Sequence, residues 1–168
     1  TGNQGVAVGT QAGQGLTSSD GTVAIGYKAL TALTSGAENV SIGFQAGLAL
    51  TQGRYNTIMG SDAGKVLVGN GSGEADHNTF VGWNAGKFVT TGKHNTAIGS
   101  LSMTGVDATK TTGEKNTCLG FQAGELMRGA ATGNTLLGAY AGEDLTTGSH
   151  NILIGHESEQ ASATGSNA

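Results

Sequence analysis

This sequence has no proline and one cysteine, and charged residues make up only 12% of the chain. A single cysteine, Cys118, excludes an internal disulfide framework. The eight Lys and Arg residues form no cluster and are outnumbered by 12 Asp and Glu, so the net charge of −4 argues against a nucleic-acid-binding surface. No run of about 18 apolar residues is present, so the sequence encodes no membrane span.

Aromatic residues are also scarce, at 5% of the chain, whereas 31 of the 168 residues are glycine. An ordinary globular domain has about a quarter of its residues charged and far less glycine. Apolar residues nevertheless return at a fixed phase, which argues against disorder. The start of the chain lacks the basic-then-apolar pattern of a signal peptide and falls inside a repeat, so we expect a fragment of a longer protein.

A five-residue motif recurs along the whole chain, as NTAIG at 95–99, NTCLG at 116–120 and NTLLG at 134–138. The nine motif glycines are separated by 17 residues in five of eight intervals and by 18 to 22 in the others. They are Gly9, Gly26, Gly43, Gly60, Gly82, Gly99, Gly120, Gly138 and Gly155. An aliphatic residue or Met precedes each glycine, Ala or Ser stands three positions after it, and an apolar residue stands seven positions after it in eight units. The chain is therefore a repeat protein.

Alternation within the motif predicts a short strand. We expect Thr96 and Ile98 to face inward and Ala97 to face outward, where equivalent residues would form an apolar stripe along the molecule. After the motif glycine we expect a second short strand or an extended segment. Glycines such as Gly47 and Gly64 lie in this stretch, and each would cost a helix about 1 kcal/mol relative to alanine.

One unit has too few apolar side chains to offset its conformational entropy, so the units must stack. We predict an all-β fold, a β-solenoid or β-roll of nine repeats of about 17 residues, that spans 1–155 and is roughly 43 Å long. Residues 156–168 are expected to be a degenerate last coil or a linker to a following domain. The outward apolar stripe needs a cover, which a closed cyclic oligomer supplies most simply.

Asparagine opens seven of the nine motifs, and we expect it to hold a turn and to hydrogen-bond from coil to coil as a ladder. These residues are Asn39, Asn56, Asn78, Asn95, Asn116, Asn134 and Asn151.

The motifs carry a resemblance to known families. NVSIG at 39–43 and TVAIG at 22–26 resemble the repeats of trimeric autotransporter adhesin heads, a left-handed parallel β-roll. The stretch at 134–155 is similar to repeats of bacteriophage tail fibres, and the likeness covers 3–155. It implies a parallel homotrimer on an extracellular, cell-surface or virion fibre that attaches to a host or surface. The partners would be two identical chains and a polysaccharide or protein receptor.

Four of the chain's eight aromatic residues directly follow a motif glycine, namely Tyr27, Phe44, Trp83 and Phe121. Aromatic rings at one phase suit packing between chains or stacking against sugar rings. The longest insertion, at 68–77, adds the polar candidates Asn70, Glu74 and Asp76. We expect these seven residues to contact a receptor, together with a second insertion at 105–115.

No residue breaks the repeat in a way that indicates catalysis, so we expect no enzyme, no catalytic residue, no cofactor and no metal. Glycosidase chemistry needs two carboxyl groups about 5–9.5 Å apart, and the acidic residues are scattered. His77 and His94 share one phase in adjacent coils, so we expect stacking of the coils to bring them near one another, and we interpret them as surface residues rather than metal ligands. Cys118 is expected to be a small buried hydrophobic residue.

Two other functions stay open. One is a polysaccharide depolymerase tailspike built on a solenoid. The other is an ice-binding protein, suggested by the run Thr57, Thr79, Thr96, Thr117 and Thr135. Val or Ile occupies this position in the other four units, so we expect it to face inward, which argues against ice binding.

Overall fold

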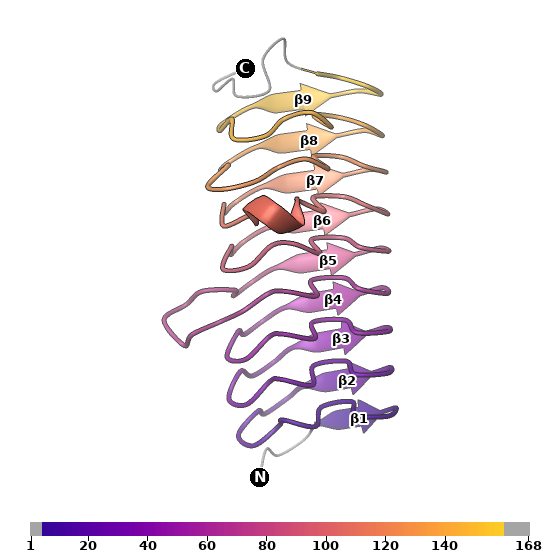
Figure 1. Cartoon of the computed structure of the whole chain (residues 1–168), viewed down its shortest axis with the longest axis vertical. Helices are drawn as coiled ribbons and strands as arrows, with labels where there is room; N and C mark the ends of the chain where they lie inside the picture. The colour runs from indigo at the N-terminus through magenta and orange to yellow at the C-terminus, as the bar shows by residue number, and fades with distance from the viewer. Residues whose placement is uncertain (1–4, 160–168) are drawn as a thin grey trace.

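The computed structural model describes residues 5–159, which form a rod of stacked coils (Figure 1). Each coil contributes one three-residue strand to a nine-stranded parallel sheet in which strand order follows chain order. The strands are β1 (Val6–Val8), β2 (Val23–Ile25), β3 (Val40–Ile42), β4 (Thr57–Met59), β5 (Thr79–Val81), β6 (Thr96–Ile98), β7 (Thr117–Leu119), β8 (Thr135–Leu137) and β9 (Ile152–Ile154). The predicted all-β solenoid of nine coils is confirmed. Residues 160–168, most of the predicted linker, lie outside the described residues.

Equivalent residues pair throughout the sheet. In β5 and β6, for example, Thr79 lies opposite Thr96 and Val81 opposite Ile98. The coils of 22, 21 and 18 residues keep this register because their additional residues leave the rod as loops. One loop bulges out between β4 and β5, and another carries the 3₁₀ helix η1 (Asp107–Thr109) between β6 and β7 (Figure 1).

The predicted orientation of the strands is wrong. Ala97 is fully buried, whereas Thr96 is half-buried and Ile98 is 37% exposed. The central residue faces the core in every strand from β2 to β9, and the two flanking residues face outward. Alternation fixes which residues share a face, but both faces of these strands are largely apolar and give no contrast to choose between them. The interior of a narrow coil accepts a single side chain per strand.

The expected second strand is also absent. Among residues 5–159, pairing beyond the named strands is limited to isolated bridges from Val89 to Thr111 and from Thr111 to Gly129. The segment that follows each motif glycine, which we call the return segment, is a series of turns with positive φ angles, such as 54° at Gln45 and 60° at Gly47. Its amides bond to the next coil, as from Gly47 N to Ala63 O at 3.0 Å. Glycine is frequent there because the left-handed backbone favours it.

The core is a thin column inside the rod. The predicted positions three and seven residues after the motif glycine are buried in the coils between the two ends of the rod, as at Ala46 and Leu50, whereas Ala12, Leu16 and Ser158 in the end coils are half-buried. Val106 is an exception, because it is only half-buried and Thr111 pairs with Val89 in its place. In the described part of the chain, no helix has the length and apolar character that a membrane crossing requires.

The motif asparagines form a buried ladder along one edge of the core, as predicted. Asn78 Oδ1 accepts hydrogen bonds from the backbone N of Asn95 at 3.0 Å and from its Nδ2 at 3.3 Å. Asn95 Nδ2 also donates to Gly113 O at 3.0 Å. The pattern repeats from Asn39 to Asn151. Each coil is thereby pinned to the next just before its strand begins.

Candidate functional site

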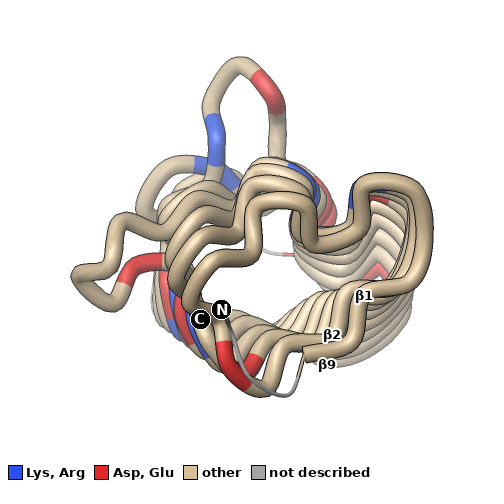
Figure 2. Tube along the Cα trace, turned by 90° about the horizontal axis from the view of Figure 1, so that it is seen from below, with Lys and Arg blue, Asp and Glu red and all other residues tan. Residues whose placement is uncertain are grey.

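The outward surface of the sheet is the most distinctive surface of the rod. We call it the outer face and define it as the first and third residue of each strand together with the residue after each motif glycine. None of its 27 positions is Lys, Arg, Asp or Glu, although the chain has 20 such residues. In the view along the rod, the stacked strands are tan, which means that they carry no charged residues. The blue Lys and Arg residues and the red Asp and Glu residues lie on the return segments and loops (Figure 2).

Apolar exposure concentrates on this outer face. Every large hydrophobic residue with an exposed side chain in residues 5–159 belongs to it, except Tyr55 and Val68. The members are Val6, Val8, Tyr27, Phe44, Met59, Trp83, Ile98, Leu119, Phe121, Leu137, Ile152 and Ile154. Large exposed apolar patches on proteins commonly serve as interaction surfaces.

The four predicted aromatic contacts all lie on the outer face, in the column beside the strands. Tyr27 and Phe44 stack with ring centroids 5.3 Å apart. Phe121 meets Tyr140 edge to face at 5.3 Å, and Trp83 is 54% exposed. The four rings extend the apolar surface past the ends of β2, β3, β5 and β7.

The three polar candidates lie elsewhere. Asn70 closes a turn within the insertion, where its Oδ1 accepts a hydrogen bond from Ser72 N at 2.9 Å. Asp76 ties the insertion to the preceding coil, because its Oδ1 accepts from Arg54 N at 2.8 Å. Glu74 is half-buried between them. The insertion leaves the rod away from the strands (Figure 2), so the structure does not gather the aromatic and polar candidates into one site.

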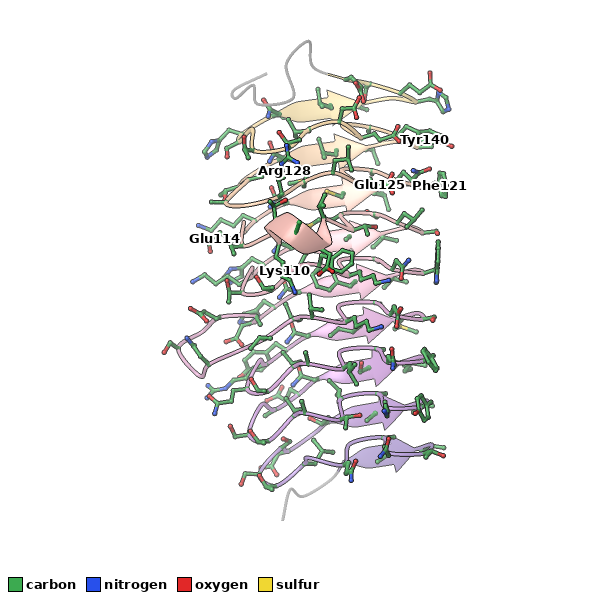
Figure 3. All side chains as sticks on the ribbon, viewed as in Figure 1. Lys110, Glu114, Phe121, Glu125, Arg128 and Tyr140 are labelled. Carbon is green, nitrogen blue, oxygen red and sulfur yellow. The ribbon has the colours of Figure 1, made fainter. Side chains whose placement is uncertain are left out.

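The residue before each motif asparagine forms a further exposed column next to this insertion. Tyr55 and His77 stack with centroids 4.8 Å apart, and His77 and His94 stack at 5.2 Å with ring planes 6° apart. The predicted proximity of the two histidines is confirmed. In Figure 3, Glu114, next to this column, lies on the opposite side of the rod from Phe121.

The last three coils bring together carboxylates that are dispersed in the sequence. The pKa of the Glu143 carboxyl is raised by desolvation and by the charges of Glu125, Asp144, Glu159 and Glu157. Glu125 and Glu143 both stand five residues after a motif glycine, so alignment of the acidic residues by phase finds this pair. Among residues 5–159, no group of three or more His, Cys, Asp or Glu residues is placed to hold a metal ion.

Asp62 is an example of a carboxylate held in ion pairs. Its Oδ1 lies 3.3 Å from Lys65 Nζ and its Oδ2 lies 3.5 Å from Lys87 Nζ. Both carboxylate oxygens are therefore occupied by lysine ammonium groups, which is unlike a general acid whose carboxyl must be free to meet a substrate.

Cys118 is fully buried, as predicted, with its Sγ 3.8 Å from Met127 Sδ. Burial raises the pKa of its thiol from 9.0 to about 12. A neutral buried thiol is neither a nucleophile nor a metal ligand, so Cys118 belongs to the core.

Comparison with protein-family models, with curated proteins and with solved structures finds no match.

Proposed function

We propose that this chain is a structural and adhesive segment of an extracellular or virion fibre in which three parallel copies assemble through their outer faces. The observation that carries the proposal is the uncharged, largely apolar outer face that runs along all nine strands. Its burial would be favourable by about 25 cal/mol for each Å² of apolar surface.

The repeat makes the outer face self-complementary for copies that lie side by side and are related by rotation about an axis parallel to the rod. Such copies place equivalent coils at the same level, so that apolar columns meet apolar columns along the whole length. Side chains in the aromatic column change from coil to coil, as from Ser61 to Trp83 to Ser100. This irregularity opposes a slip by one coil. The number three comes from the resemblance to trimeric adhesin heads and tail fibres.

Attachment to a receptor is assigned to the insertions at 68–77 and 105–115. Both leave the rod away from the strands (Figure 2), so an assembly through the outer faces leaves them accessible. Binding residues are often found on loops that a rigid scaffold positions. A polysaccharide or protein on a host or other surface is the expected partner.

Light scattering tests the assembly, with an expected mass three times that of the 16.6 kDa chain. We expect Ile98→Lys to convert the trimer to monomer, because three copies of the substitution would place unpaired ammonium groups in an apolar interface. Val68→Lys is the matched control, since Val68 is apolar and 40% exposed, close to the 37% of Ile98, but lies off the outer face. A wild-type monomer, or an Ile98→Lys trimer, would refute the proposal.

The outward orientation of the threonines favours ice binding as a second candidate. Thr57, Thr79, Thr96, Thr117 and Thr135 stand in register on the outer surface of β4 to β8, at a strand spacing of about 4.8 Å. The reason for setting this function aside, an inward orientation, is therefore removed. A monomer that shows thermal hysteresis, lost in Thr96→Lys, would select this function over the trimeric fibre.

A further inference from the structure

His77 and His94 are brought together by the stacking of coils. They are separated by 17 residues, and each directly precedes a motif asparagine, so the strict register of β5 and β6 places them side by side. Both have left-handed backbones, with φ of 56° and 57°. The same backbone conformation points the two side chains in the same direction, which gives nearly parallel rings with centroids 5.2 Å apart.

Both imidazoles are exposed to solvent. The contacts described for their side chains in residues 5–159 are ring stacking, between His77 and Tyr55 and between the two histidines. Stacking uses the ring faces and leaves the nitrogen atoms in the ring plane available. A neutral imidazole with an available nitrogen is a ligand for divalent transition metals.

The charges around the pair are balanced. The residues directly before Tyr55, His77, His94 and Lys115 alternate in sign, and they are Arg54, Asp76, Lys93 and Glu114. Lys93 Nζ lies 3.7 Å from Glu114 Oε2, which partly neutralises both groups. Lys115 follows His94 in its column and Glu38 precedes Tyr55. A cation that approaches the histidines is therefore neither strongly repelled nor strongly attracted by the neighbouring charges.

We propose that His77 and His94 together bind one late first-row divalent ion, such as Zn²⁺, Ni²⁺ or Cu²⁺. Metal–nitrogen bonds of about 2.0–2.1 Å in tetrahedral geometry place two ligand nitrogens about 3.4 Å apart. The two rings are stacked nearly parallel with centroids 5.2 Å apart, so binding requires both exposed side chains to rotate out of the stack until one in-plane nitrogen of each faces the shared ion. Water completes the coordination sphere, so the site is an open one.

Imidazole also determines which ions are excluded. Ca²⁺ and Mg²⁺ prefer oxygen ligands, so the histidine pair does not select them. The same column contains a third exposed histidine, His150, but the preceding coil places Gly133 at that position. His150 has no partner of this kind there and serves as an internal control.

The experiment titrates the chelator-treated protein with Zn²⁺ or Ni²⁺ in a calorimeter, beside His77→Gln, His94→Gln and His150→Gln. We expect one ion per chain for the wild type. Loss of either paired histidine removes chelation and weakens binding by about 10²-fold, whereas His150→Gln leaves it unchanged. All three residues are exposed, so circular dichroism should show the same folded state for each variant.

The proposal is overturned if His77→Gln or His94→Gln keeps wild-type affinity, if His150→Gln loses as much, or if Ca²⁺ competes on equal terms. Cu²⁺ electron paramagnetic resonance adds a readout of ligand type, with coupling to two nitrogens expected in the wild type and to fewer in each single variant. Both ligands come from one chain, so the result does not depend on whether that chain is a trimer or a monomer.

Discussion

At the scale of single residues, the motif glycine is required for two reasons. Gly43 has a φ of +139°, a conformation that residues with a Cβ rarely adopt. A Cβ at Gly43 would also lie 2.5 Å from the carbonyl oxygen of Gly60 in the next coil. The coils are therefore stacked too closely at this corner for any side chain.

The two reasons can be separated by Gly43→Ala and Gly155→Ala. Gly155 has a similar φ of +128°, but a Cβ there would meet nothing closer than Ser158 Cβ at 3.9 Å. We expect Gly155→Ala to lower the free energy of unfolding by about 1–3 kcal/mol through backbone strain. Gly43→Ala adds the collision with backbone and should cost distinctly more in denaturant titrations. Equal costs for the two variants would show that the close approach of the coils is unimportant.

Cys118 makes stability depend on pH in the alkaline range. Its pKa is 9.0 ordinarily and about 12 in the folded chain, so between these values the unfolded chain loses the thiol proton while the folded chain keeps it. The stability that the neutral buried thiol contributes to the folded chain is intact below pH 9.0 and is lost as the pH rises toward 12. The free energy of unfolding should fall by about 1.4 kcal/mol per pH unit there.

Lysine and tyrosine also titrate in this range, so the measurement compares wild type with Cys118→Ala. Alanine suits the site because Ala97 occupies the same position in the preceding coil. The alkaline slope of the wild type should exceed that of Cys118→Ala, and identical slopes would contradict the assignment.

At the scale of the repeated element, the asparagine ladder fixes where each strand begins. In Asn95→Ala, the backbone N of Asn116 would lose its acceptor at 3.0 Å, and Asn116 Nδ2 would lose the one at 3.1 Å but keep Ala131 O. The carbonyl of Gly113 would also lose the hydrogen bond that Asn95 Nδ2 donates at 3.0 Å. A buried polar group without a partner costs about 1–3 kcal/mol. We therefore expect a loss of more than about 3 kcal/mol in the free energy of unfolding.

Asn70→Ala is the control for this loss. Asn70 is exposed and accepts one hydrogen bond from Ser72 N in a loop, so its replacement should stay within about 0.5 kcal/mol. If both asparagine variants are equally mild, the ladder is not a source of stability.

At the scale of the whole molecule, the rod accepts additional residues where a coil can release them as a loop. Val68 N donates to Thr90 O at 2.8 Å and Ala75 N donates to Thr91 O at 3.2 Å. Both ends of the longest insertion are thus held on adjacent residues of the next coil. The residues between them contribute little to the stacked core.

Deletion of 70–74 shortens the 22-residue coil to the 17-residue length of its neighbours. Gly69 and Ala75 would then take the places that Gln52 and Gly53 occupy in the coil before. We expect the circular dichroism, melting temperature and assembly mass to change little, because shortening a loop alters its closure entropy only slightly. Receptor binding should be lost if this insertion makes the contact.

Deletion of 45–49 is the contrasting case. It also removes five residues, but from the return segment that carries the buried Ala46. This change shifts the register of the stack and should unfold the chain. Unfolding caused by the 70–74 deletion instead would show that the loop is part of the core.

The sequence by itself determined the number of coils, their register and the buried Ala and Leu columns. Residues that recur at a fixed phase occupy equivalent places once the coils stack, whatever path the chain takes between them. For the same reason the phase of His77 and His94 predicted their proximity.

Only the tertiary structure decided which face of each strand is directed to the core. Both faces carry apolar residues, such as Ala97 on one and Ile98 on the other, so the contrast between a polar and an apolar face that orients a strand is missing. It also decided the course of the return segment, since the left-handed turns at Gln45 and Gly47 depend on hydrogen bonds to the neighbouring coil. With the orientation reversed, the threonines and aliphatic residues expected in the core form the outer face, which is the surface that both the proposed assembly and the ice-binding alternative require.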